Sequence, residues 1–413
     1  MYRQFWIIIL CVSGFLLLSA GVTPASAANF RSTSSLRSMA RIYMASGGYE
    51  KAQPLLESAL ELARSWGAED SEMCACALDL AFLYKNQGRL AEAEEMCLAG
   101  LELQEKLNGP NHPHVAHTLR ILNEIYQGQV RYRQAAESLE RAITIMRKVA
   151  GEDAVEVAPL RVDMARLLVT QGQFKRAESL FAEALVTIEN GYGLEHAYTA
   201  KVLTSVATLY LRQGRHRRAE ELTDRALVVL EKVYGVNHHF LVPVWLVMSG
   251  TCQAKGELAE AKALLEKSLA VSSKRTSYGR LAESDVLNRL GEFHILCENY
   301  SKAEPVLREA LEILASSQGA DGDRTAAVLG NLAKVRMSKG RHARAQELCL
   351  RALDILDRVF DEDHPHVADV LETLAESHRL DGDETEADRL EKRAAQIRVQ
   401  KRLAYARRAV TVQ

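Results

Sequence analysis

The sequence predicts an all-α solenoid of about nine antiparallel helix pairs with a C-terminal capping helix, and two regularities indicate it. A turn position recurs 41 residues apart once and 42 residues apart seven times, at Gly47, Gly88, Val130, Gly172, Gly214, Gly256, Glu298, Gly340 and Gly382. Five residues after each turn position stands an alanine: Ala52, Ala93, Ala135, Ala177, Ala219, Ala261, Ala303, Ala345 and Ala387. A period between about 20 and 50 residues is typical of stacked repeats.

The composition favours helices and excludes one class of partner. The 413 residues include only 8 prolines, and 52 basic residues are balanced by 54 acidic ones for a net charge of -2. Abundant Ala, Leu, Glu and Arg favour helices. A protein that binds nucleic acid would normally carry a basic excess. We therefore expect no nucleic-acid partner.

A second recurring stretch lies between the turns and predicts the start of the first helix of each pair. Its fullest forms are Gly109-Pro-Asn-His-Pro113-His-Val-Ala and Asp361-Glu-Asp-His-Pro365-His-Val-Ala. Looser forms begin at Gly67, Gly151, Gly193, Gly235 and Gly319. We expect the glycine to end the preceding helix, a polar or Asn/Asp residue to cap the next one, and proline to occupy its first turn.

Small residues indicate where the two helices of a pair touch. They recur near the middle of the first helix, at Ala40, Ala81, Ala165, Ala207, Ser249, Gly291, Ala333 and Ala375, with Asn123 as the larger exception. The alanines after the turns face them on the second helix. Small residues on both sides let two helix axes approach closely. The predicted structural positions are therefore Gly88 and Ala93, Gly172 and Ala177, Gly214 and Ala219, Gly256 and Ala261, and Gly340 and Ala345.

Three features depart from the regular repeat, and each predicts a local structural property. Val130 and Glu298 replace the turn glycine, at a cost of about 1 kcal/mol each if the left-handed backbone is kept there. The stretch Ser272 to Gly279 blurs one junction and predicts a hinge. The charged helix from about Glu384 to Arg408 suits the polar cap that a solenoid needs, and a basic arm for nucleic acid or anionic lipid is the alternative.

The ends of the chain predict three segments. Residues 1–27 combine Arg3, an apolar run and Ala25-Ser26-Ala27, which is typical of a cleaved secretory signal. An uncleaved membrane anchor is the alternative, since the apolar run approaches spanning length. Residues 28–404 form the repeat array and residues 405–413 a tail. We expect an exported protein, periplasmic or extracellular, with no membrane span after cleavage.

No catalytic motif is recognisable, so we expect no enzyme, no cofactor and no metal site. His112, His114 and His117 form the densest cluster of metal-ligating residues, but His112-Pro-His recurs as His364-Pro-His at the same repeat position, which favours a structural role. Six cysteines follow the signal, and Cys76, Cys97, Cys252 and Cys349 stand where other repeats have hydrophobic residues. We expect these to be core residues.

The small residue, tyrosine, turn glycine and two alanines at Ala207, Tyr210, Gly214, Ala219 and Ala226 resemble the tetratricopeptide repeat. The 42-residue unit with its Gly-x-x-His-Pro-x-Val-Ala stretch is similar to the repeats of kinesin light chains and of related bacterial proteins. This resemblance covers roughly residues 33 to 400. It implies a right-handed superhelix whose first helices line a concave groove that takes up protein segments.

The resemblance also implies which residues face that groove. In the first half they are Arg37, Arg41, Lys85, Asn86, His117, Arg120, Glu124, Arg166, Lys201, Thr204 and Arg212. In the second half they are Asp285, Asn288, Glu292, Asn331, Lys334, Asp369, Glu372, Glu376 and Arg379. The first set is mainly basic and the second mainly acidic. This predicts a groove that orients an extended partner with its acidic part toward the N-terminal repeats, unless the charges are merely scattered.

The sequence thus favours a non-catalytic scaffold that binds a peptide or protein segment in the groove. The alternative is an assembly component of an envelope complex that self-associates, or binds through its helix edges and convex face.

Overall fold

The computed structural model describes residues 32–65, 70–272, 277–316, 322–360 and 364–409. The predicted signal at 1–27, the helix-start residues Gly67, Gly319 and Asp361, and residues 273–276 of the predicted hinge lie outside these ranges. Within them, no helix combines the length and the apolar character needed to cross a bilayer.

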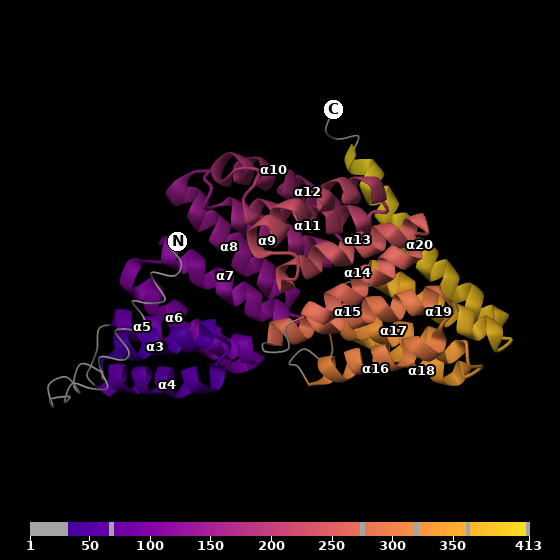
Figure 1. The fold of residues 1–413 in the computed structure, drawn as a ribbon, viewed down its shortest axis with the longest axis horizontal. Helices are drawn as coiled ribbons and strands as arrows, with labels where there is room; N and C mark the ends of the chain where they lie inside the picture. The colour runs from indigo at the N-terminus through magenta and orange to yellow at the C-terminus, as the bar shows by residue number, and fades with distance from the viewer. Residues whose placement is uncertain (1–31, 66–69, 273–276, 317–321, 361–363, 410–413) are drawn as a thin grey trace.

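The described residues form α-helices, one short 3₁₀ helix and no strands, which confirms the all-α prediction (Figure 1). The helices are α3 (Thr33–Ala45), α4 (Tyr49–Ser65), α5 (Asp70–Gln87), α6 (Leu90–Asn108), α7 (Pro113–Gly128), α8 (Tyr132–Ala150), α9 (Ala158–Thr170), α10 (Phe174–Tyr192), α11 (Ala197–Arg212), α12 (His216–Tyr234), η1 (His239–Leu241), α13 (Val242–Lys255), α14 (Leu258–Val271), α15 (Ser277–Leu296), α16 (Tyr300–Ala315), α17 (Asp323–Met337), α18 (His342–Val359), α19 (Pro365–Leu380) and α20 (Glu384–Ala409).

In the described part of the chain, the helices pack as nine consecutive antiparallel pairs, from α3 with α4 to α19 with α20. Each pair also contacts the next one. The first helices, which carry odd numbers from α3 to α19, additionally touch the first helices of neighbouring pairs, whereas the second helices make no comparable contacts with one another among the described residues. The array therefore curves with its first helices inside, and we call the side that they line the inner face.

The turn inside each pair has a left-handed backbone. The φ angle is positive at all nine turn positions, including 68° at Gly172 and 72° at Gly214. Val130 with φ 63° and Glu298 with φ 55° keep the same conformation without the freedom of glycine. The turn geometry is thus retained in every repeat, even where the side chain opposes it.

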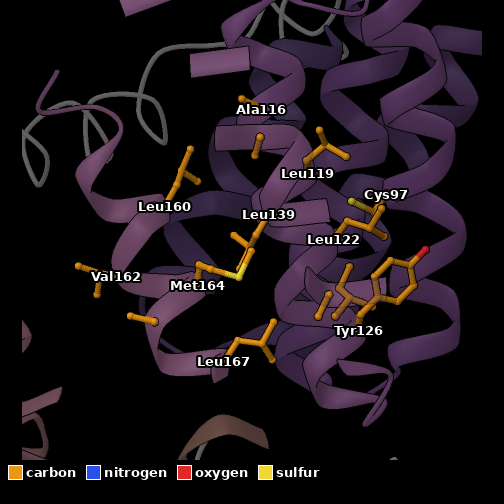
Figure 2. Close-up of a cluster of buried hydrophobic side chains, with 14 of the residues drawn as sticks. Cys97, Ala116, Leu119, Leu122, Tyr126, Leu139, Leu160, Val162, Met164 and Leu167 are labelled. Atoms are coloured by element: carbon orange, nitrogen blue, oxygen red, sulfur yellow. The ribbon is translucent and has the colours of Figure 1, made fainter. Parts of the chain in front are cut away.

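The helix–helix contact predicted from small residues is confirmed. All nine alanines that follow the turns are fully buried, as are Ala40, Ala81, Ala165, Ala207, Ala333 and Ala375 on the first helices. Larger side chains fill the space around these contacts, and Figure 2 shows Leu119, Leu122 and Tyr126 of α7 together with Leu139 of α8 and Met164 of α9. Close helix axes and interlocking leucines give a series of buried clusters that follow one another along the array.

The starts of the first helices differ from the prediction in one respect. Gly109, Gly151, Gly193 and Gly235 do end the preceding helices, each with positive φ, and Pro113 and Pro365 do occupy the first turn. The expected polar cap is present at the best-formed starts, but it is a histidine and not Asn or Asp. Nδ1 of His112, His196, His238 and His364 accepts a hydrogen bond from the backbone N–H two residues later. An unprotonated imidazole nitrogen thus accepts the N-cap hydrogen bond that a carboxylate or hydroxyl oxygen usually accepts.

The last helix covers the open end of the array. Ala387, Leu390, Ala394 and Ile397 form the buried side of α20, while Arg389 on its other side is exposed. One buried stripe and one charged face are what a terminal cap requires.

The described cysteines form no disulfide. Cys74, Cys76, Cys97, Cys252 and Cys349 are buried and free, and Cys297 is exposed. Burial raises the pKa of the Cys97 and Cys349 thiols to about 12, so both stay protonated at neutral pH. The five buried cysteines serve as small hydrophobic residues of the core.

The positive φ at Glu298 gives a stability prediction. Replacing this exposed residue by glycine should relieve the left-handed strain and raise the free energy of unfolding by up to about 1 kcal/mol. Glu298→Ala keeps the strained backbone and should leave stability unchanged within about 0.5 kcal/mol. Urea unfolding followed by circular dichroism measures both. Equal stability of the two variants would contradict this account of the turn.

Candidate functional site: the inner face of the helical array

The predicted groove residues all lie on first helices, but they are spread along most of the array. The structure places them on α3 (Arg37, Arg41), α5 (Lys85, Asn86), α7 (Arg120), α9 (Arg166), α11 (Lys201, Arg212), α15 (Asp285, Asn288, Glu292), α17 (Lys334) and α19 (Glu372, Glu376). They form a long surface rather than one pocket. Any partner that used them all would have to be extended.

At the N-terminal end, carboxylates from the next repeat pair with the predicted basic residues. Asp79 of α5 accepts hydrogen bonds from Arg37 at 2.7 Å and from Arg41 at 2.9 Å. Lys85 pairs with Glu124 of α7 and also lies over the ring of Phe82. Arg41 nevertheless keeps 59% of its side chain exposed, so it remains available to a partner.

A similar pair joins α7 and α9. Arg120 donates a hydrogen bond to Asp163 at 2.6 Å, and Arg166 lies 4.0 Å from the other carboxylate oxygen. Burial raises the pKa of Asp163, although Arg120 and Arg166 oppose the shift. Because the Asp163 side chain is only 14% exposed and that of Arg166 is 58% exposed, Arg120 holds the buried carboxylate while Arg166 faces solvent.

Two further basic residues of the first half lie near rings. The Lys201 ammonium is 3.8 Å from the centroid of the Phe240 ring and 5.2 Å from that of Tyr234. Arg212 lies 3.5 Å from Nε2 of His366, which belongs to the last helix pair. Burial lowers the pKa of Arg212, and the nearby Arg289 lowers it further.

In the second half, the predicted acidic residues are paired as well. Asp285 accepts a hydrogen bond from Arg324 at 2.8 Å, and Glu292 pairs with Arg289 at 3.1 Å. Asn331 donates to Asn288 at 3.0 Å and to Glu292 at 3.1 Å. These amides already bind each other, so a partner backbone would have to compete with them.

The last repeat combines paired and exposed residues. Arg398 of α20 holds both Glu372 and Asp369 of α19, at 2.7 and 2.8 Å. Lys334 and Glu376 are exposed.

The pairing partners follow a rule that the sequence analysis missed. A residue ten positions before one turn contacts the residue nine positions before the next turn, as in Arg37 with Asp79, Arg120 with Asp163, and Asn288 with Asn331. Pairing residues at these two offsets along the sequence could have found Asp79 and Asp163. Asp79, Glu124 and Asp163 neutralise part of the predicted basic half, and Arg289, Arg324 and Arg398 part of the acidic half. Opposite potentials along the groove stay a prediction.

A second row, six residues before each turn, contains a residue that the sequence analysis overlooked. The row contains Arg41, Phe82, Glu124, Arg166, Thr208, Gly250, Glu292, Lys334 and Glu376. Phe82 is its one aromatic member, and 43% of the residue is exposed. Its shared offset with Arg41 and Arg166 is the signal that could have identified it.

Metal-ligating side chains come together at one place in the described part of the chain, Cys252 with Glu257 and Glu260. Burial and the two carboxylates raise the pKa of the Cys252 thiol to about 11. At the histidines of α7, His112 caps the helix, and burial together with Arg120 lowers the pKa of His117.

The profile of the tetratricopeptide repeat matches residues 72–148, 124–189, 156–227, 198–274 and 324–398, and a second profile of the same repeat matches residues 35–65. The chain belongs to the tetratricopeptide repeat family. Tetratricopeptide repeats indicate a protein–protein interaction scaffold, and such folds are typically non-enzymatic. No curated protein matched the chain.

Solved structures with similar repeats include a putative kinesin light chain from Podosopora anserina with nearly identical TPR-like repeats. It is 22% identical, with 49% of this chain and 96% of that chain covered and a TM-score of 0.42. Another is BtubC (BKLC) from P. vanneervenii, at 20% identity, with 60% and 90% covered and a TM-score of 0.40.

The Arg120–Asp163 pair gives a prediction about stability and pH. Arg120→Met leaves the buried Asp163 carboxylate without its main partner, which should cost about 1–3 kcal/mol at neutral pH. The pKa of Asp163 is already raised and should rise further. The deficit should therefore be largest above the raised pKa and shrink as the pH falls through it, because the protonated carboxyl of the folded chain no longer needs the guanidinium.

Arg41→Met is the matched control, because Asp79 keeps Arg37 as a partner. Urea unfolding at pH 7 and pH 4.5 measures both variants. A deficit for Arg120→Met that does not change with pH would contradict the assigned role of Asp163.

Proposed function

We propose that this protein is an exported, non-catalytic scaffold that binds an extended protein or peptide segment along the inner face of its helical array. The observation that carries the proposal is that exposed side chains recur at one repeat offset of the inner face. The row at offsets nine and ten holds neighbouring repeats together, while the row at offset six keeps exposed side chains at Arg41, Phe82, Arg166, Lys334 and Glu376. A row of exposed side chains at a constant repeat offset suits an extended ligand.

Phe82 supports a specific anchor point in the N-terminal repeats. Exposed aromatic side chains surrounded by polar groups are frequent anchors of protein interfaces. Arg41 shares its row, and the Lys85 ammonium lies 5.0 Å from the centroid of the Phe82 ring. This combination suits a partner segment that carries an apolar residue next to acidic residues.

Lys334 and Glu376 supply charges of both signs at the other end of the row. They support a partner of mixed charge there, with its acidic part at the N-terminal repeats. Export rests on the Ala25-Ser26-Ala27 pattern of the sequence.

Charge reversal within the exposed row tests the binding face. Arg41→Glu with Arg166→Glu should weaken capture of an acidic partner from the exported-protein fraction by roughly tenfold or more, and Phe82→Ala should do so independently. Arg120 is not a suitable target, although it shares the inner face. A glutamate at that position would face Asp163 and destabilise the array.

The matched control is Arg133→Glu with Arg217→Glu, which makes the same change in charge on the second helices α8 and α12. Both side chains are 92% exposed and pair only within their own helix. The affinity of the captured protein is measured for each variant, and circular dichroism checks that each variant is folded. A loss of affinity in the inner-face variants alone supports binding on the inner face. If the control pair loses the partner and the inner-face pair keeps it, the partner binds the outer face.

A further inference from the structure

Residues more than 150 positions apart meet where the third, fourth and fifth helix pairs face the eighth and ninth. Tyr132, at the start of α8, donates a hydrogen bond to Asp323 of α17 at 2.9 Å. The Tyr132 ring also stacks on Phe360, with ring centroids 5.4 Å apart and planes 12° apart. Tyr132 is only 7% exposed. Both an apolar and a polar contact therefore join the two halves of the chain.

His364 makes the second connection. Its ring stacks on Phe360 with centroids 3.7 Å apart, and its Nε2 lies 2.8 Å from the carbonyl oxygen of Thr170 at the end of α9. Because Nδ1 accepts the N–H of His366, the ring proton sits on Nε2 and is donated to Thr170. The neutral imidazole thus uses both nitrogens, one for its own helix and one for the distant repeat.

The fit is tight at a third point. A Cβ added to Gly172 would lie 2.8 Å from Cδ of Pro365. At Gly214, the equivalent turn position of the next pair, the backbone has nearly the same φ and an added Cβ would meet nothing within 4 Å. Gly172 therefore serves the left-handed turn and also leaves room for the proline.

The contact joins hydrophobic cores that are otherwise separate. Val359 and Phe360, at the end of α18, pack against the core of the N-terminal helix pairs and against that of the last pairs. At the same place His366 of α19 lies 3.5 Å from Arg212 of α11. We call Phe360, His364, Pro365 and His366, together with their partners Tyr132, Thr170, Gly172, Arg212 and Asp323, the clasp.

We propose that the clasp is a reversible closure: it holds the superhelix closed on itself at neutral pH and opens when its histidines take up protons. The inference does not depend on the proposed function, since it concerns contacts within one chain. Opening would change the distance between the two halves of the inner face, and so the geometry offered to any partner.

Protonation opposes the closed contact at two atoms. A proton on Nδ1 of His364 removes the acceptor that caps α19. A proton on Nε2 of His366 places a second cation 3.5 Å from the Arg212 guanidinium. The same His-Pro-His sequence at residues 112–114 caps α7 in the same way, but His114 is exposed and meets no distant arginine.

The charged groups around His366 come from four helices. Arg212 on α11 disfavours its protonation, while Asp323 on α17, Asp369 on α19 and Glu292 on α15 favour it. Burial and Arg212 together outweigh the three carboxylates and lower the pKa of His366. Because folding lowers the pKa of His366, protonation of this residue costs the folded chain free energy. The folded chain therefore keeps its full stability above the ordinary histidine pKa of about 6.5 and loses stability as the pH falls below that pKa.

Small-angle scattering of the full chain tests the closure with two matched glycine variants. Gly172→Ala and Gly214→Ala impose the same left-handed strain, which the chain already tolerates at Val130 and Glu298, but only the first collides with Pro365. At pH 7.5 we expect Gly172→Ala to have a larger radius of gyration than Gly214→Ala, with equal helical content by circular dichroism. Phe360→Ser, which removes both ring stacks, should expand the chain similarly and serves if Gly172→Ala does not fold.

A pH series tests the histidines. Between pH 7.5 and 5.5 we expect the radius of gyration of the natural chain and of His114→Gln to increase. His366→Gln should respond less, because glutamine can still accept a hydrogen bond from Arg212 but takes up no proton. Equal dimensions of folded Gly172→Ala and Gly214→Ala would overturn the closure. An unchanged response of His366→Gln would overturn the role of His366, and no response of the natural chain would overturn the control by protons.

Discussion

The left-handed turn within each helix pair is the constraint on which the rest of the structure depends. It brings the alanine five residues later against the small residue of the preceding helix, and the two helix axes lie close because neither side chain keeps them apart. Since this contact repeats at a nearly constant spacing, a given offset from the turn faces the same direction in every pair. The positions of the functional side chains follow from that register. Val130 and Glu298 keep the conformation without glycine, so neighbouring contacts are strong enough to impose it.

Residues of the inner face differ in what they contact according to their distance in sequence from the turn. Residues nine and ten positions before the turn bind across the junction between repeats, as Arg37 does with Asp79 and Arg120 with Asp163. Charge that looks available in the sequence is thus partly used in holding the solenoid together. Six positions before the turn, Glu124 and Glu292 also pair across a junction, but Arg41, Arg166, Lys334 and Glu376 stay exposed to solvent. Phe82 adds an exposed hydrophobic side chain to this row.

The repeat made most of the fold predictable from sequence, because each helix pair is determined by contacts within itself and with its neighbours. The turn positions, the buried alanines and the capping helix were all recognisable. The histidine caps were not, because a histidine beside a proline also resembles a metal ligand or a surface residue. Phe82 was not predicted, because a single phenylalanine on an amphipathic helix resembles a core residue, although its offset from the turn places it on the exposed row.

The clasp could not be predicted from the repeat. It depends on the curvature that accumulates over about five helix pairs, and this brings Tyr132 to Phe360 and Thr170 to His364. A small change in the angle between successive pairs would separate them. The sequence contains one hint: Phe360, immediately before Asp361-Glu-Asp-His-Pro-His, stands where most equivalent positions have asparagine, alanine or tyrosine.

Site-specific photo-crosslinking tests most directly whether a partner lies on the inner face. A photoreactive phenylalanine analogue at position 82 probes the exposed row, and the same analogue at Val228, which is 68% exposed on the second helix α12, probes the outer side. With the natural partner present, the account predicts a covalent adduct from position 82 and none from position 228. An adduct from position 228 alone would contradict it and would place the binding surface on the outer helices.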